Sequence, residues 1–380
     1  MRSLVIALIL LCCCVLLALG YNTFLNGSGE HTYQSEALYA VKSFDQDAIC
    51  CGIKAKNIIL FIGDGMGPAQ VFAAMTANNG TLNMTTLKYT GFSKTNSGSH
   101  YVTDSSAGST AIATGKKTYN HAIGVGMNSL PLKTILELAE DKGLSTGIVA
   151  TAAITDATPA SFIAHRIERS NYEEIALDFL NTDIDIFIGG GKDHFEKRKD
   201  SRNLLRELEQ KGYQISNSLN EPITKSKAAV FTAALDNPEA DGRKNMLPFA
   251  TQKALELLSK NKNGFFLMVE GSQIDWGCHN NNLHMVIEET LDMDRAVAVA
   301  LEFAEKNGDT LVIVTADHEC GGLAVTKGSL DKGLVGAEFT SCNHTAAMVP
   351  VFATGPGAEK FTGVYENTAL FDKMTAALGL

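Results

Sequence analysis

Short apolar runs alternate with longer amphipathic stretches along most of this chain. Six runs are nearly continuous in apolar residues, as strands buried on both faces are, and they predict strands at 57–63, 146–154, 185–188, 264–269, 310–315 and 349–354. Apolar residues recur at helical spacing in 132–142, 172–180, 202–211, 249–259, 285–306 and 366–378. This alternation predicts an α/β fold, with a mostly parallel central sheet and helices on both faces, in one domain over 56–380.

The first twenty residues form a separate pattern. Arg2 precedes an apolar run at 4–19, and Ala18-Leu19-Gly20 offers small residues for cleavage before Tyr21. This pattern is typical of a secretory signal peptide, 1–20, and the run is short for a bilayer span. We therefore expect an exported protein, periplasmic or extracellular. The three cysteines at 12–14 leave a lipid- or membrane-anchored form open. The polar residues 21–55 are expected to form a flexible start of the mature chain.

Composition restricts the partners of this protein and its cysteine chemistry. A formal net charge of −10 over 380 residues argues against a nucleic-acid-binding surface, and an anionic substrate would need a local positive site. Of the eight cysteines, three lie at 12–14, which leaves five and therefore at least one unpaired within the mature chain. No CxxC pair indicates a zinc-finger-like site, and one disulfide could form between partners that the sequence does not identify. The five are Cys50, Cys51, Cys278, Cys320 and Cys342.

Acidic residues follow four of the predicted strands. These residues are Asp64, Asp156, Glu270 and Asp317. Ligands bind beyond the carboxyl ends of the strands in open parallel sheets, so the four side chains should converge on one edge. A single aspartate after a strand is more often a helix cap or a turn former. Four converging carboxylates repel one another unless protons or cations neutralise them, so together they favour metal binding.

Histidines accompany several of these acids. Asp317 and His318 are adjacent, Asp275 and His279 are four apart and share one face of a helix, and His344 precedes the last predicted strand. Mixed aspartate and histidine ligands suit zinc. An all-oxygen set suits magnesium, and its members are Asp156, Thr158 and Glu270.

A serine nucleophile is a candidate in the segment VTDSSAGSTAIATG (102–115), which predicts a turn leading into a helix of small residues. Ser105 or Ser106 would lie at the helix N-terminus, where free N–H groups and the helix dipole favour an anion. A metal ion can activate such a serine in place of a general base. On the residues alone, a mere capping role for Asp104 or Ser105 is equally acceptable.

The positive site for an anion would come from an arginine. Arg169 is the better candidate because a guanidinium forks onto two phosphate oxygens, and Arg166 competes with it from three residues away. A solvated arginine on a helix surface is the alternative for either residue.

Six motifs, taken together and in this order, resemble those of the alkaline phosphatases. They are GDGMG (63–67), TDSSAGSTAIATGKKTYN (103–120), DATPASFIAHRIER (156–169), EGSQIDWGCH (270–279), TADHECGG (315–322) and NHT (343–345). Each motif is modest on its own, but six in the family order are highly specific. The resemblance runs from about residue 56 to the C-terminus.

The resemblance implies a role for each residue that matches a motif. Ser105 matches the phosphorylated serine, and Arg169 matches the phosphate-binding arginine, so Arg166 would be a bystander. The resemblance implies two zinc ions and one magnesium ion. One zinc would be held by Asp275, His279 and His344. The other would be held by Asp64, Asp317 and His318, with Ser105 completing its ligands. Magnesium would be held by Asp64, Asp156, Thr158 and Glu270.

Three positions depart from some members of that family. Trp276 occupies a substrate-binding position that is lysine in some members, and an indole cannot supply that charge. Asp156 is histidine in other members, and a carboxylate there should favour magnesium. Only 25 residues separate His318 from His344, so the crown insertion that members often carry between them should be small.

The resemblance implies hydrolysis of small phosphate monoesters at alkaline pH through a phosphoserine, by an enzyme that is commonly a homodimer. The nearest alternative is another hydrolase of the superfamily, such as a phosphodiesterase or a sulfatase. A more distant one is a non-catalytic exported protein that binds metal or phosphate.

Overall fold

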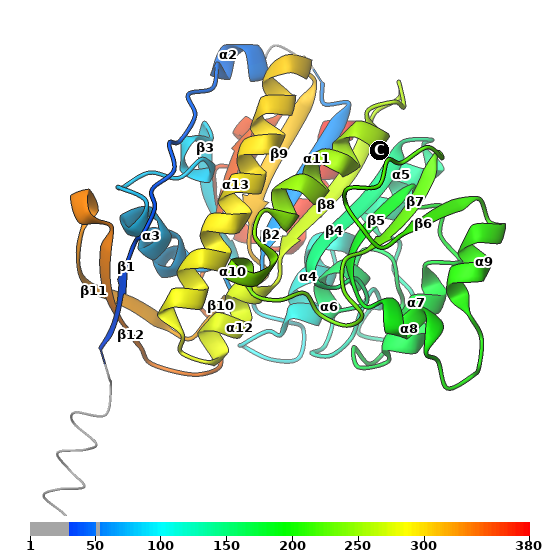
Figure 1. Ribbon diagram of the computed structural model, residues 1–380, viewed down its shortest axis with the longest axis horizontal. Helices are drawn as coiled ribbons and strands as arrows, with labels where there is room; N and C mark the ends of the chain where they lie inside the picture. The colour runs from blue at the N-terminus through cyan, green and yellow to red at the C-terminus, as the bar shows by residue number, and fades with distance from the viewer. Residues whose placement is uncertain (1–29, 51–53) are drawn as a thin grey trace, which may run out of the picture.

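The computed structural model describes residues 30–50 and 54–380, so the predicted signal peptide lies outside the described residues. A ten-stranded sheet forms the centre of the molecule (Figure 1). Its strands are β2 (Asn57–Gly63), β3 (Tyr89–Lys94), β4 (Ser145–Ala153), β5 (Ile186–Gly190), β6 (Tyr213–Ser216), β7 (Lys227–Phe231), β8 (Phe265–Gly271), β9 (Thr310–Thr315), β14 (Val349–Thr354) and β15 (Gly363–Glu366). Their order is β15-β3-β14-β9-β2-β8-β4-β5-β7-β6.

Strand direction in this sheet confirms the mostly parallel arrangement. Strand β14 pairs antiparallel with both β3 and β9. The other neighbouring pairs are parallel. All six predicted strands are present, and β2, β9 and β14 have the predicted bounds.

Four strands of the sheet escaped prediction, and their sequences explain why. Strand β3 (YTGFSK) and strand β6 (YQIS) mix polar with apolar residues, and both are only partly buried. Strand β7 (KAAVF) is short and rich in alanine, while β15 (GVYE) is an edge strand without a buried residue. These strands lie towards the two ends of the sheet, where the apolar signal of a doubly covered strand is absent.

Helices cover both faces of the sheet. Eight helices carry most of this cover: α3 (Pro68–Ala77), α4 (Ser105–Thr114), α5 (Ile135–Asp141), α7 (Tyr172–Asp178), α9 (Leu204–Gln210), α11 (Met246–Leu258), α13 (Leu283–Asn307) and α14 (Thr368–Leu378). Alternate residues of β2 point to opposite sides: Ile59 and Phe61 join the core under α3, α11 and α13, whereas Leu60 joins the core under α4, α5 and α14. Because both faces are buried, the strand needs an unbroken apolar sequence.

Several acidic residues on α13 serve the fold. Helix α13 crosses the face that also carries α11, as Figure 1 shows. Arg243 donates to Glu289 and Asp292, and both of these carboxylate side chains lie on α13 and are fully buried. Buried carboxylates therefore occur on α13 with a protein partner, in contrast to those at the sheet edge.

Within 30–50 and 54–380, no helix is long and apolar enough to cross a bilayer.

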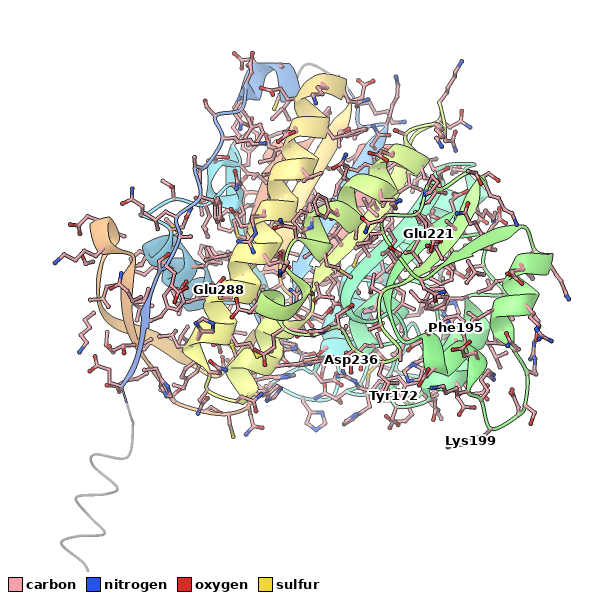
Figure 2. The ribbon with its side chains drawn as sticks, in the orientation of Figure 1. Tyr172, Phe195, Lys199, Glu221, Asp236 and Glu288 are labelled. Atoms are coloured by element: carbon pink, nitrogen blue, oxygen red, sulfur yellow. The ribbon has the colours of Figure 1, made fainter. Side chains whose placement is uncertain are left out.

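An aromatic cluster closes the far end of the sheet, beside β5 and β7. Phe195, labelled in Figure 2, packs edge-on against Phe179 and Phe231, with ring centroids 5.7 and 5.0 Å apart. Phe195 lies in α8 (Lys192–Glu196), which follows β5 directly. The cluster anchors α8 and the end of α7 to this end of the sheet.

A small second sheet stands apart from the main one, in the order β1-β12-β11. It combines β1 (His31–Gln34) with the hairpin of β11 (Leu323–Ser329) and β12 (Leu334–Phe339), which lies between His318 and His344. The expected crown is therefore present and small. Within the segment 21–55, which was expected to be flexible, residues 30–50 carry β1 and the short helix α2 (Gln46–Ile49). Strand β1 was not predicted because its sequence, HTYQ, has no apolar pattern: only Tyr33 in it is buried.

Candidate metal centre and nucleophile

The carboxyl edge of the parallel strands gathers the predicted acidic residues. Asp64 follows β2 directly, Asp317 lies two residues beyond β9, and Asp156 lies three residues beyond β4. Glu270 is the penultimate residue of β8, opposite Ile62 of β2. The register of these neighbouring strands thus brings carboxylates from separate parts of the chain to one edge.

His344 reaches the same edge because β14 runs in the opposite direction. The start of an antiparallel strand lies where its parallel neighbours end, and His344 lies five residues before β14 in the short strand β13 (His344–Thr345). Helix α12 (Gln273–His279) follows β8 and presents Asp275 and His279 one turn apart.

The first group of candidate ligands is Asp275, His279 and His344. The Nε2 atoms of the two histidines are 3.1 Å apart, and each lies within 3.4 Å of an Asp275 carboxylate oxygen. The Nδ1 of His279 contacts the Cys342 carbonyl at 2.7 Å, and the Nδ1 of His344 contacts the Thr103 carbonyl at 2.9 Å. Since a carbonyl only accepts, each Nδ1 carries the hydrogen and each Nε2 offers a lone pair to the same point.

The second group is Asp64, Asp317 and His318. The Nε2 of His318 lies 3.2 Å from Asp64 Oδ1 and 3.4 Å from Asp317 Oδ2, and all three side chains are buried. The His318 ring stacks on the His344 ring with centroids 3.6 Å apart, so the two groups adjoin. The ligand atoms within each group lie within 4.8 Å of one another.

Buried polar atoms without a partner show that these groups fit cations. Asp64 Oδ1, Asp275 Oδ1 and Asp317 Oδ2 are buried without a hydrogen bond, and so is Thr158 Oγ1. An unsatisfied buried oxygen costs free energy, and a carboxylate costs more than a neutral group. Divalent ions bound to these groups would satisfy such oxygens, and the mixed aspartate and histidine donors suit zinc.

The charges at the edge shift the pKa values of its members. Burial, together with the charges of Asp317 and Asp275, raises the pKa of Asp64 well above its usual range. Burial and the charge of Asp275 raise the pKa of Asp317 to about 8. Burial also acts to raise the pKa of Asp275, but His279, His318 and His344 outweigh it and lower that pKa. Without cations, protons must therefore neutralise part of the edge.

The predicted magnesium residues are less tightly gathered than the two groups above. Thr158 and Glu270 are buried, and Glu270 accepts a hydrogen bond from Ser272. Burial, and to a lesser degree the charge of Asp156, raises the pKa of Glu270 well above its usual range. Asp156 instead accepts from Arg169 Nη2 at 3.3 Å. Oxygen donors alone supply this set, as magnesium prefers.

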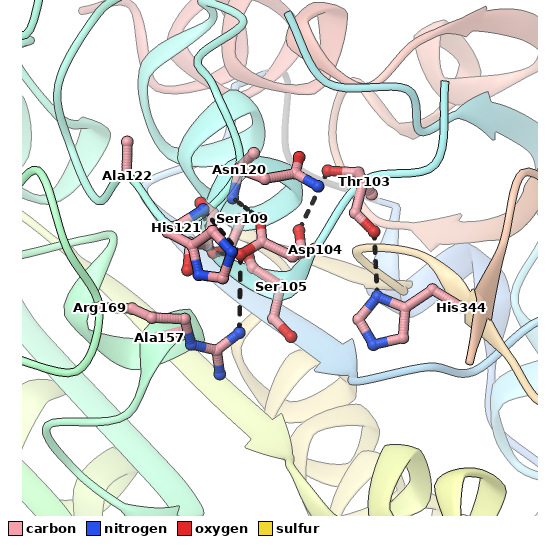
Figure 3. Close-up of polar contacts among 12 residues, drawn as sticks. Thr103, Asp104, Ser105, Ser109, Asn120, His121, Ala122, Ala157, Arg169 and His344 are labelled. Carbon is pink, nitrogen blue, oxygen red and sulfur yellow. Dashed lines mark hydrogen bonds and ion pairs between the residues drawn. The ribbon is translucent and has the colours of Figure 1, made fainter. Parts of the chain in front are cut away.

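Ser105 is the first residue of α4, and Asp104 is its N-cap, accepting from the Ala107 N–H at 3.0 Å. The Ser105 hydroxyl lies 3.3 Å from His318 Nε2, and Figure 3 shows it pointing into the space between Arg169 and His344. Helix α4 comes this close because Gly108 faces the Asp317 backbone: a Cβ there would lie 2.8 Å from the Asp317 carbonyl oxygen. Ser106 is buried, and its hydroxyl has no hydrogen-bond partner.

The two candidate arginines have different surroundings. Arg169 faces Asp156 at 3.3 Å and Asp104 at 3.8 Å, on the side of Ser105 opposite His344 (Figure 3). Burial would lower the pKa of Arg169, but the charges of Asp156, Asp104 and Asp64 outweigh it and raise that pKa. Arg166 instead forms a two-pronged ion pair with Asp178, at 2.9 and 2.5 Å.

Two residues near the first group differ from the rest of the site. Trp276 lies on α12 between Asp275 and Gly277, and it is half-buried. Cys320 was not predicted as a site residue, yet its sulfur lies within 4.8 Å of the ligand atoms of Asp275, His279 and His344. Its place two residues after His318 was a signal in the sequence, but the contact with α12 depends on the fold.

The sheet is mostly parallel, is covered on both faces and carries groups of carboxylates and histidines at its carboxyl edge. This arrangement is typical of metal-dependent hydrolases, and comparison with known proteins identifies the family. The family model for alkaline phosphatase matches residues 55–335. The chain is 34% identical to alkaline phosphatase 4 of Bacillus subtilis, over 82% of this chain and 86% of that one. It is 35% identical to the alkaline phosphatase of Escherichia coli, over 86% of each.

A solved structure agrees with the sequence relatives. It is a variant of the alkaline phosphatase from the Antarctic bacterium TAB5, in which aspartate replaces a histidine, with Mg bound in its M3 site. The TM-score is 0.82 and the identity 42%, over 86% of this chain and 98% of that one. The chain therefore belongs to the alkaline phosphatase family, and it is an enzyme that hydrolyses phosphate monoesters.

The raised pKa values predict that metal binding releases protons. In protein freed of metal by a chelator, Asp317, with a pKa of about 8, is largely protonated at pH 7, and a metal must displace that proton. The pKa of Asp64 is raised in the same direction by burial and by the charges of Asp317 and Asp275. Zinc binding should therefore release about one proton or more per chain at pH 7 and fewer at pH 9, and zinc affinity should rise over that interval. Calorimetry in buffers with different ionisation enthalpies measures both quantities. Equal proton release at the two pH values would contradict the assigned charge states.

Proposed function

We propose that this enzyme hydrolyses phosphate monoesters at alkaline pH through a covalent phosphoserine on Ser105. The observation that carries the proposal is the position of the Ser105 hydroxyl. It belongs to the first residue of a ten-residue helix, lies 3.3 Å from His318 Nε2 and points into the space between Arg169 and His344 (Figure 3). Both serines are buried, but the Ser106 hydroxyl has no hydrogen-bond partner, whereas the Ser105 hydroxyl contacts the candidate ligand His318, so Ser105 is the better placed of the two.

The residues of this chain bind the phosphoryl group and direct the displacement. The N-terminus of α4 and the Arg169 guanidinium hold the phosphoryl oxygens beside the Ser105 oxygen. That oxygen forms a bond to phosphorus as the ester oxygen leaves, and water later breaks the phosphoserine bond and releases phosphate. Divalent cations bound at the two groups would supply Lewis-acid stabilisation of the charge on the attacking, leaving and phosphoryl oxygens.

We infer that the cations are two zinc ions and one magnesium ion per chain. The Asp275, His279 and His344 group and the Asp64, Asp317 and His318 group have the donors that zinc prefers. The oxygen donors Asp156, Thr158 and Glu270, with Asp64, suit magnesium. The TAB5 variant that holds Mg has an aspartate in place of a histidine, and Asp156 is likewise a carboxylate where other family members have a histidine.

Elemental analysis of the purified enzyme should find two zinc ions and one magnesium ion per chain, and an enzyme stripped by a chelator should recover full activity only with both metals. Asp156→Ala should lose magnesium and keep zinc, because Asp156 belongs to the oxygen set alone. Loss of zinc and magnesium together from this variant, in a protein that remains folded, would count against separate sites.

The nucleophile is tested by a pair of adjacent variants. Ser105→Ala should lower kcat by more than about a thousandfold and abolish the acid-stable phosphoenzyme, because the attacking oxygen is gone. Ser106→Ala is the matched control and should still form phosphoenzyme, since the Ser106 hydroxyl that it removes is buried and has no hydrogen-bond partner. Trapping with a labelled monoester, followed by peptide mapping, identifies the modified residue. Phosphate found on any other residue would overturn the assignment.

The two arginines give a second matched pair. With a neutral indole at Trp276, Arg169 supplies the side-chain charge for phosphate. Arg169→Ala should lower kcat/KM by about a hundredfold and weaken inhibition by inorganic phosphate. Arg166→Ala should leave phosphate inhibition unchanged and lower the Tm, because it breaks the ion pair with Asp178. Steady-state kinetics and thermal unfolding separate the two effects, and the reverse pattern would exchange the two roles.

A further inference from the structure

Two buried cysteines that the proposed reaction does not use lie behind the first group. Cys278 is on α12, directly before the candidate ligand His279. Cys320 is in β10 (Glu319–Cys320), two residues after the candidate ligand His318. Both side chains are fully buried, and both are free thiols in this structure.

The packing around these cysteines brings them together. A Cβ built on Gly321, the neighbour of Cys320, would lie 3.3 Å from the Cβ of Cys278. The Gln70 side chain bridges the two residues: its Nε2 lies 3.6 Å from Cys278 Sγ and 2.7 Å from the Cys320 carbonyl oxygen. The Cys320 sulfur also lies 3.8 Å from the backbone carbonyl oxygen of Asp275, three residues before Cys278 on α12.

We propose that Cys278 and Cys320 form a disulfide that fastens helix α12 to strand β10 behind the Asp275, His279 and His344 group. The two thiols lose two protons and two electrons to a disulfide donor such as oxidised glutathione, which leaves as two thiols. Because both sulfurs are buried, the exchange takes place while the chain folds, before α12 closes over β10. An oxidising compartment, as the predicted signal peptide implies, would supply such a donor.

The bond would hold together every segment that carries a ligand of the first group. Helix α12 carries Asp275 and His279, and β10 pairs with β13, which carries His344. A cross-link between α12 and β10 therefore limits the separation of the three ligands and should slow the loss of a metal held between them. The proposal rests on the packing of the cysteines and not on the phosphoserine mechanism.

The surrounding cysteines provide controls. Cys342 is exposed, although its carbonyl accepts from His279. Cys50 lies in another part of the fold, 3.9 Å from Thr354 Oγ1. Neither residue should be linked to Cys278 or Cys320.

The test compares the whole protein refolded with zinc in reduced or in oxidised glutathione. Free thiols are alkylated in denaturant, and the digest is mapped by mass spectrometry with and without reductant. The oxidised sample should yield one peptide pair joined through Cys278 and Cys320, while Cys342 is alkylated in both samples. Alkylation of both Cys278 and Cys320 in the oxidised sample, or a bond of either to another cysteine, would overturn the proposal.

Metal retention gives a second readout, and its first comparison uses the same two samples of the unaltered protein. Zinc release to a chromogenic chelator should be on the order of tenfold slower from the oxidised protein. Cys278→Ser should remove this difference, and Cys342→Ser should keep it. A thiolate-to-cobalt absorption band in the cobalt-substituted protein, lost in Cys320→Ser, would instead make Cys320 a metal ligand and refute the disulfide.

Discussion

The mutual repulsion of buried carboxylates at one edge of the sheet is the constraint on which this site depends. Asp64, Asp275, Asp317 and Glu270 are all buried there, and three of them have raised pKa values. Elsewhere in the fold, buried acids such as Glu289 are neutralised by a buried arginine. At the edge, histidines and unpartnered oxygens surround the acids, so a cation is the natural neutralising partner.

The sheet topology brings the side chains that can bind a cation to the same edge as these carboxylates. Parallel strands place Asp64 and Asp317 at neighbouring ends, and the single antiparallel strand β14 brings His344 to the same edge from the opposite direction. Helix α4 adds Ser105, and it can come close only because Gly108 has no side chain to meet the Asp317 backbone. A cation held at this edge would therefore lie beside an anion-binding helix terminus and an arginine, which explains how a chain with a net charge of −10 can bind phosphate.

The less regular parts of the fold support the same edge. Because the crown is small, only 25 residues lie between His318 and His344 in the chain, and β1 from the N-terminal segment completes the sheet of the crown. Behind the ligands, Gln70, Cys278 and Cys320 fill the space between α12 and β10. The proposed disulfide would make that packing permanent.

The sequence by itself determined the α/β class, six strands of the sheet and the candidate ligands that the fold gathers at its carboxyl edge. It could do so because a doubly covered strand requires a continuous apolar run, and because the family motifs are local in sequence. It missed β1, β3, β6, β7 and β15, whose half-exposed or alanine-rich sequences lack that signal. Helix spacing alone placed Asp275 beside His279.

Only the tertiary structure decided the relations between distant segments. In the sequence Arg166 competes with the better candidate Arg169, and the ion pair of Arg166 with Asp178 distinguishes the two because that aspartate lies on another element. Likewise, five cysteines left the pairing open, and the proximity of Cys278 to Cys320 around Gln70 depends on how α12 packs against β10. Contacts between distant segments are set by the packing of whole elements, which a local pattern does not record.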